Sequence, residues 1–545
     1  MLLLCAWPCG GVEPVVEQRP FPDVFPCSLA PAARVVVCNL QSEPEDRRLM
    51  FMTLQGIVNR TRPEIYLLSK GSDRRWIDWY AQQKWIREVT GLEHNDELLE
   101  RYRLRVRGVV VTDPDLPASI NVATMIASLE EAVVVSPDLV RQAGLPVLTD
   151  LRGRWKTSAE AYRWAFENLW PRLNHHVIAC LYPQYHELRD YLVENKIFTL
   201  WISGRNDGDP AWADSDSEVK LMEELLVKMP VNIPVLGYPL RENMKGYGED
   251  TGVRLFGKYG KYLVGSASVG NLSVHSGIPA GTLRQYPAPT LPEFNPGKVY
   301  YSWIISDGDN LPVATDYNYP KLWSEPVRGQ LPLGWSLSPS ASVLMPGVMR
   351  YYYQTATPND EFICSVDGVG YTFPCIYGSG YTGRHQDEIF SGFLRQTATY
   401  MRRSDMTSIW LHNEYNDAYI NRYPLTIPFL NAMFPDYAKQ VSKYAEATYV
   451  SSRNTPVFRA ITTIKWVDFK DRYAADVRQA RIIQMADDIR KISTERPAFL
   501  NAFAFNWYTD LPALKQISDD LGPDYVPVRP GQLAELYRQS LDQQH

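Results

Sequence analysis

The sequence lacks several features that identify common classes of protein. Its 545 residues contain no apolar run of the ~20 residues that span a bilayer, so no membrane span is expected. Acidic residues (62) outnumber lysine plus arginine (56), and a net charge of −6 without an evident basic face argues against a nucleic-acid partner. There is no Walker A motif and no GxGxxG motif after a strand, so no nucleotide cofactor is expected.

Cysteine is present but carries no recognisable pattern. The seven cysteines include no CxxC pair and no zinc-ligand spacing. Cys364 and Cys375 are close enough in sequence to form a disulfide in an oxidising compartment, or they remain two thiols. The apolar start, Met1–Cys9, lacks a basic region and a full apolar core, so it resembles only the tail of a truncated signal peptide.

The composition that is present describes a globular protein rich in aromatic residues. Hydrophobic residues make up 45% and charged residues 22% of a chain long enough for two to four domains. Aromatic residues make up 12%, with 15 Trp and 33 Tyr. Such rings stack on the C–H faces of sugars, but they also fill large cores. Both interpretations stay open at this point.

The chain divides into an irregular arm, several small α/β units and one large domain. Short apolar strands alternate with amphipathic helices up to a proline-rich stretch, 279–296, which can form neither helix nor central strand. The predicted segments are a leader or wrapping arm (1–30), three α/β subdomains (31–105, 106–196 and 197–285) and a C-terminal domain (296–545).

The C-terminal domain is predicted to be a (β/α) barrel of the TIM type, complete, incomplete or distorted, with an open doubly wound sheet as the alternative. The expected strands are 298–305, 333–337, 361–366, 407–411, 446–450, 456–464 and 498–505. The expected helices are 341–352, 386–402, 426–437, 470–493, 510–521 and 529–541.

Polar and aromatic residues follow these strands, where sites lie in such folds. Strand 298–305 is followed by Asp307, Asp309 and Asn310, which could bind a sugar or a cation, or merely form an Asx turn. Trp335 is either a stacking platform or a core residue. The other candidates at strand ends are Asp367, His412, Glu414, Asn506 and Trp507. Glu414 is the preferred proton donor, because aromatic walls would raise the pKa of its carboxyl.

The most specific motif is Gly368-Val369-Gly370-Tyr371-Thr372-Phe373-Pro374, a turn rich in glycine and aromatic residues. It resembles the signature of the GxGYxYP family, described as putative glycoside hydrolases, with Phe373 in place of the second Tyr. Stretches 306–310, 334–340, 351–353 and 54–61 extend the resemblance over most of the chain. The resemblance implies a carbohydrate substrate and export to the cell envelope or medium. Gly370, Tyr371 and Phe373 would form a binding wall.

Three functions are compatible with this pattern. The first is glycoside hydrolysis, with Asp307 or Asp309 as nucleophile or base and Glu414 as acid. The second is a metal-dependent deacetylase using Asp307, Asp309, His385 and His412, although no cofactor is otherwise expected. The third is a non-catalytic glycan-binding protein that uses the aromatic rim, with Trp335, Tyr371, Phe373 and Trp507, alone. The sequence does not indicate an oligomeric state.

Overall fold

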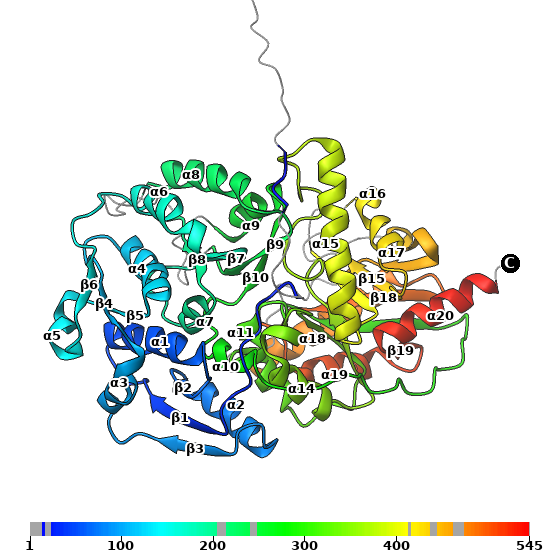
Figure 1. Cartoon of the computed structure of the whole chain (residues 1–545). Helices are drawn as coiled ribbons and strands as arrows, with labels where there is room; N and C mark the ends of the chain where they lie inside the picture. Colours follow the sequence, from blue (N-terminus) through cyan, green and yellow to red (C-terminus); the bar gives the residue numbers. More distant parts are fainter. Residues whose placement is uncertain are drawn as a thin grey trace, which may run out of the picture.

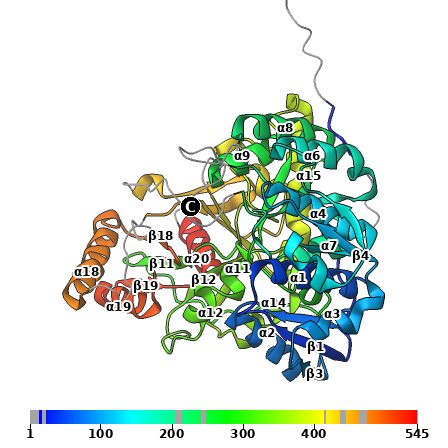
Figure 2. The ribbon, with the colours of Figure 1, turned by 90° about the vertical axis from the view of Figure 1, so that its left-hand side faces the viewer.

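The computed structural model describes residues 13–16, 23–203, 214–239, 248–412, 416–435, 444–461 and 474–543. Three small parallel α/β units are followed by one large curled sheet with its helices (Figures 1 and 2). The predicted α/β class, with small units preceding an incomplete barrel, is confirmed.

The first two units each contain a three-stranded parallel sheet. The strand orders are β2-β1-β3 and β5-β4-β6. The central strands β1 and β4 are short runs of valine that are buried on both faces, as expected for a parallel sheet covered by helices. The first unit consists of β1 (Arg34–Asn39), α1 (Glu45–Asn59), β2 (Ile65–Leu68), α2 (Gly71–Gln82), β3 (Glu88–Gly91) and α3 (Asp96–Tyr102). The second consists of β4 (Gly108–Val111), α4 (Ala118–Glu130), β5 (Ala132–Val135), α5 (Val140–Ala143), β6 (Val147–Asp150) and α6 (Ser158–Asn168).

The third unit contains a four-stranded parallel sheet of order β10-β9-β7-β8. Its elements are β7 (Asn174–Cys180), α7 (Arg189–Glu194), β8 (Ile197–Leu200), α8 (Ser215–Lys228), β9 (Ile233–Gly237), α9 (Glu249–Lys258), β10 (Lys261–Gly265) and α10 (Leu272–His275). The boundary expected at 196 needs correction, because it separates β7 from the β8 and β9 strands with which it pairs. The strand 176–181 belongs to the third unit and not to the second.

The C-terminal domain is a curled half-barrel of mostly parallel strands in the order β16-β17-β15-β14-β13-β12-β11-β18. Among the described strands of this domain, β16 alone runs antiparallel. Ala460, just after β17, meets Asn501 of β18 in an isolated parallel bridge. The strands are β11 (Val299–Ile305), β12 (Leu333–Leu337), β13 (Asp360–Cys364), β14 (Ser408–Leu411), β15 (Ala432–Pro435), β16 (Thr448–Ser451), β17 (Thr455–Phe458), β18 (Ala498–Ala504) and β19 (Tyr525–Pro527).

Helices follow most strands of the half-barrel and cover one face of its sheet, whereas α20 (Pro530–Asp542) packs against the other face, where Tyr537 meets Phe458 and Phe499. They are α11 (Leu311–Thr315), α12 (Asn318–Trp323), α13 (Ala341–Leu344), α14 (Pro346–Thr355), α15 (Gly383–Arg403), α16 (Asp417–Ile420), α17 (Arg422–Thr426), α18 (Ala475–Ile492), α19 (Leu511–Leu521) and α20 (Pro530–Asp542). The long helix α15 lies where the third unit and the half-barrel meet (Figure 1).

The predicted helix 426–437 is wrong, because the chain forms strand β15 there. Its four residues are fully buried and pair with β14 in parallel register. Pro428 and Pro435 interrupt any helix, and a short apolar run has no period that separates strand from helix. Strand β19 was not predicted, since its three residues are too few to form a pattern.

The described part of the N-terminal arm packs against two units, as a wrapping arm should. Phe25 is fully buried and its ring meets Tyr400 of α15 edge to face at 5.8 Å. Tyr191 of α7 donates a hydrogen bond to the carbonyl of Pro26. Among the described residues no helix is long and apolar enough to cross a membrane.

Candidate active site

Asp307 follows β11, where β11 and β18 run in parallel register to Ile305 and Ala504. This pairing places the residues after the two strands next to each other. The Asp307 carboxylate accepts hydrogen bonds from Ser306 Oγ and from Asn506 Nδ2, the latter at 3.0 Å. Asn506 is buried and therefore holds Asp307 in place rather than facing a ligand.

The loop after β11 is pressed against the end of β12 at Gly308. A Cβ at this position would lie 1.7 Å from the carbonyl oxygen of Ser336, so only glycine fits. Gly308 accepts a hydrogen bond from the Ser338 N–H at 2.9 Å. The flanking Asp307 and Asp309 are therefore fixed at the carboxyl end of the sheet.

Asp309 is the carboxyl group whose ionisation is most clearly perturbed in this loop. It is half-buried and accepts a hydrogen bond from Ser365 Oγ at 3.3 Å. Removal from water, with further contributions from the charges of Asp307 and Glu249, raises the pKa of Asp309 to about 8. At neutral pH Asp309 therefore holds a proton, whereas one oxygen of Asp307 accepts two hydrogen bonds.

Asp367, after β13, is a third carboxyl group at the same edge. It is fully buried, and its Oδ1 accepts a hydrogen bond from the backbone N–H of His412 at 2.8 Å. Burial, and to a smaller extent the charge of Asp309, raise the pKa of Asp367 well above its usual range, although the N–H groups of His412 and Thr372 oppose this shift. Asp367 and His412 support the edge of the site from within, and both are buried.

The third unit contributes two residues that the sequence analysis missed. Tyr238 follows β9 and Glu249 begins α9. Burial, the charge of Glu249 and a hydrogen-bonding interaction with it raise the pKa of Tyr238 well above its usual range. The charge of Asp309 also raises the pKa of Tyr238. Residues of the third unit and of the half-barrel therefore influence one another electrostatically. Applying the strand-end rule to strand 233–238 would have found Tyr238.

A pocket of about 210 Å³ lies between the third unit and the half-barrel, and its lining includes Asn310, the residue after Asp309. Half of its lining residues are aromatic, and all four of these are half-buried. The lining residues are Tyr185, Tyr238, Ala267, Ser268, Asn310, Pro312, Tyr317 and Trp507. Two of the predicted binding residues, Asn310 and Trp507, therefore lie in one pocket, with the Trp507 and Tyr317 rings 5.8 Å apart.

The signature turn binds to the third unit rather than lining this pocket. The backbone N–H and C=O of Tyr371 pair with Leu263 of β10 at 2.7 and 2.8 Å. A Cβ on Gly370 would lie 2.5 Å from the ring of Tyr262 and 2.6 Å from the Leu263 carbonyl oxygen. Gly370 thus permits a close approach of two backbones, and the Tyr371 side chain is 6% exposed.

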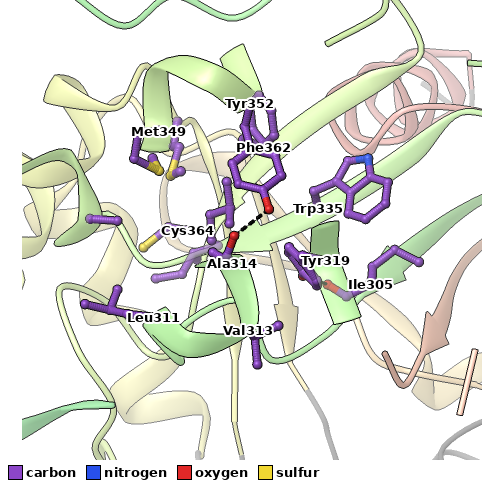
Figure 3. Close-up of a cluster of buried hydrophobic side chains, with 14 of the residues drawn as sticks. Ile305, Leu311, Val313, Ala314, Tyr319, Trp335, Met349, Tyr352, Phe362 and Cys364 are labelled. Atoms are coloured by element: carbon purple, nitrogen blue, oxygen red, sulfur yellow. Dashed lines mark hydrogen bonds between the residues drawn. The ribbon is translucent and has the colours of Figure 1, made fainter. Parts of the chain in front are cut away.

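Two aromatic residues expected to bind sugar are core residues instead. Trp335 is fully buried, and its indole N–H donates to Asp360 Oδ1 at 2.9 Å; Figure 3 shows it among apolar side chains. Phe373 is also fully buried, with the Arg254 guanidinium 4.4 Å from its ring centre. Neither ring is accessible to a ligand, so both assignments need correction.

The predicted metal set does not assemble. His385 lies in the first turn of α15, where its Nε2 is 3.4 Å from Glu13. Within the described ranges no three His, Cys, Asp or Glu side chains gather to hold a metal ion, so Asp307, Asp309, His385 and His412 form no such group. Glu414 lies outside the described residues. Cys364 and Cys375 are not joined to each other, and the Cys364 thiol donates to the Gly368 carbonyl at 3.4 Å.

The fold and the site define a multidomain α/β protein whose curled parallel sheet carries acidic residues at the carboxyl ends of its strands. Four family models match successive segments: the first, second and third GxGYxYP N-terminal domains (34–104, 106–173 and 175–277) and the "GxGYxYP putative glycoside hydrolase C-terminal domain" (297–538). The chain belongs to the GxGYxYP family. The third-domain match begins at 175, in agreement with the position of β7.

One solved structure shares the whole architecture. A crystal structure described as "a putative hydrolase from Bacteroides thetaiotaomicron VPI-5482" aligns with a TM-score of 0.79 at 20% identity. The alignment covers 97% of this chain and 98% of that one, so the two proteins have the same fold from the first unit to the last. No curated protein matches the sequence significantly.

Proposed function

We propose that the chain hydrolyses a glycosidic bond in the cleft between the third unit and the half-barrel. The observation that carries this proposal is the pair of unlike carboxyl groups, Asp307 and Asp309, on either side of Gly308. Asp307 accepts two hydrogen bonds, whereas the pKa of Asp309 is raised to about 8, so Asp309 holds a proton at neutral pH. Glycoside hydrolysis requires one protonated carboxyl group and one carboxylate, and the proposal gives these states to Asp309 and Asp307.

In the proposed reaction Asp309 donates its proton to the leaving-group oxygen as the glycosidic bond breaks. The Asp307 carboxylate stabilises the positive charge that develops at the anomeric carbon, either by attacking it or by activating a water molecule. Asn506 orients Asp307 throughout. Glu249 keeps a negative charge close to Asp309 and so favours its protonated form before each turnover.

The aromatic pocket supplies a binding place for a sugar ring next to this pair. Tyr185 and Tyr238 come from the third unit, and Tyr317 and Trp507 come from the half-barrel. Aromatic faces around a small pocket bind the apolar faces of a pyranose, and the Asn310 amide offers hydrogen bonds to its hydroxyl groups. This arrangement favours a carbohydrate over an extended peptide.

The proposed function is tested by measuring reducing-end release from a panel of oligosaccharides with different sugars and linkages. The wild-type chain should cleave at least one member, and Asp307→Asn and Asp309→Asn chains should fail on that member. If a saccharide binds with equal affinity to all three proteins and none of them cleaves it, the chain is a glycan-binding protein.

A plot of kcat/KM against pH should show a descending limb near pH 8. A general acid works only while protonated, so kcat/KM should fall as pH rises through the pKa of Asp309, about 8. Replacing Glu249 with Gln removes a negative charge that raises this pKa, so the limb should move to lower pH. A limb that stays in place in Glu249→Gln would contradict the influence of the third unit on Asp309.

Removing the Trp507 ring should weaken substrate binding without removing catalysis. An aromatic contact is worth about 1–1.5 kcal/mol, so Trp507→Ala should lower kcat/KM by about tenfold, mainly through KM. Trp155→Ala is a matched control, because Trp155 is also half-buried but its ring contacts Trp164 in the second unit, at 5.2 Å between centroids. Equal kinetics of the two variants would argue against a sugar subsite at this pocket.

A further inference from the structure

The first unit carries a pocket rich in arginine at the amino-terminal edge of its sheet. The pocket has a volume of about 580 Å³. Its lining residues are Ala33, Arg34, Val36, Arg62, Glu64, Arg87, Glu88, Arg101 and Tyr102. Because β1, β2 and β3 are parallel, their starting residues meet at this edge, and the arginines that are dispersed in the sequence gather there.

The arginines of the pocket outnumber its carboxylates. Arg34 pairs with Glu88 at 2.8 Å, and Arg62 pairs with Glu64 at 3.1 Å. Arg87 and Arg101 are exposed and form no ion pair with any described carboxylate. The pocket lining therefore has a net charge of +2 on a chain whose net charge is −6.

The basic surface continues into the connection to the second unit. Arg103 and Arg105 follow α3 at alternate positions after Arg101. Arg105 is exposed and donates to the hydroxyl of Thr61, with no ion pair in the described part of the chain, whereas Arg103 pairs with Glu100 at 3.2 Å. Leu104 between them is fully exposed. No basic face is evident in the sequence, because these arginines come from four separate segments.

We propose that this arginine pocket binds a glycan chain that bears carboxylate or sulfate groups. Guanidinium forks bind such oxyanions through two parallel hydrogen bonds. Arg87 and Arg101 in the pocket, and Arg105 beside it, form no ion pair with a described carboxylate. The choice of a glycan rests on the proposed function. The arginine pocket lies in the first unit, at the amino-terminal edge of its sheet and not at the carboxyl-terminal edge. It would hold one part of a polymer while the proposed active site cleaves another part.

A glycan fits the pocket better than a nucleic acid does. Proteins that bind single strands combine basic grooves with exposed rings on which bases stack. The ring in this pocket, Tyr102, is 7% exposed, and its hydroxyl interacts with Glu64 and Arg101 rather than with solvent. The exposed apolar side chain beside the arginines is Leu104, which can contact a sugar face but offers no π-face for stacking a base.

The test is affinity electrophoresis of the full chain in gels that contain polygalacturonate, heparin, dextran or single-stranded DNA. The carboxylated or the sulfated polymer should retard the protein while dextran does not, and whichever retards it identifies the anionic group. The Arg87→Gln/Arg101→Gln/Arg105→Gln chain should bind that polymer at least tenfold more weakly, with a shallower dependence on salt.

A matched control is Arg74→Gln/Arg384→Gln, which removes two exposed helical arginines elsewhere, and it should bind as the wild type does. Asp309→Asn should also bind normally, so a failure of the proposed hydrolysis does not affect this test. Equal retardation by dextran, or unchanged binding by the triple variant with an unchanged melting temperature, would overturn the proposal. Preferential binding of DNA would replace it by a nucleic-acid site.

Discussion

Asp309→Asn should lower kcat/KM for an oligosaccharide by about 10²–10⁴-fold, the contribution of a positioned general acid. The amide has the shape of the carboxyl group and can still accept the hydrogen bond from Ser365 Oγ, so the fold should be unchanged. An amide cannot supply the proton that the leaving sugar needs. Thermal melting of the variant, measured alongside its kinetics, should match the wild type.

A substrate with an activated leaving group distinguishes the two carboxyl roles. A nitrophenyl glycoside leaves without protonation, so Asp309→Asn should retain much of its activity on it, whereas Asp307→Asn should lose activity on both substrates. Asp190→Asn is a matched control, because the pKa of this buried carboxyl is also raised, to about 6, but it binds Ser273 outside the site. An Asp309→Asn chain that cleaves the oligosaccharide within threefold of wild type would exclude the proposed role.

Gly370→Ala should destabilise the contact between the third unit and the half-barrel by about 2–4 kcal/mol. The new methyl group would lie 2.6 Å from the Leu263 carbonyl oxygen, which is backbone and can yield only if the bridge to Tyr371 opens. The expected cost combines overpacking with two weakened hydrogen bonds. A fall of roughly 5–10 °C in the first thermal transition would follow.

Gly71→Ala is the matched control for this substitution. Gly71 begins α2, and a Cβ there would meet no atom within 4 Å, so its melting temperature should stay the same or rise. Differential scanning calorimetry of both variants measures the difference. If the Gly370→Ala and Gly71→Ala chains have the same melting temperature, the turn does not stabilise the contact between the third unit and the half-barrel.

Patterns with a clear physical period were predictable from the sequence, and short buried segments were not. The strand at 333–337 was predicted with its observed bounds, and the helix predicted at 510–521 is α19 (Leu511–Leu521). The strand is apolar and bounded by prolines, and the helix is amphipathic over 11 residues. Strand β15 failed because four fully buried residues show no alternation, and its position follows from the gap between β14 and β17.

The position of three carboxyl groups at strand ends was predicted, but the residues of the third unit beside them were not. The strand-end rule locates Asp307, Asp309 and Asp367 because it follows from parallel pairing alone. The rule does not say which side chains of a strand face the site, because neighbouring side chains point to opposite faces of the sheet. Ser336 Oγ therefore meets the Gly308 N–H at 3.2 Å, while Trp335 beside it faces away into the core. The contribution of Tyr238 and Glu249 needed the tertiary arrangement of the third unit.

The pairing of Tyr371 with β10 also determines where this protein can be cut to make chimeras with other proteins. A half-barrel transferred to another protein without β10 would leave the Tyr371 amide unpaired. It would also expose the side of the turn where Gly370 allows Tyr262 and Leu263 to approach closely. The third unit and the half-barrel should therefore be transferred together. The first two units belong with them, because buried hydrogen bonds join Asn59 to Ser273 and Asn121 to Arg189. Chimeras cut in the proline-rich segment should not fold.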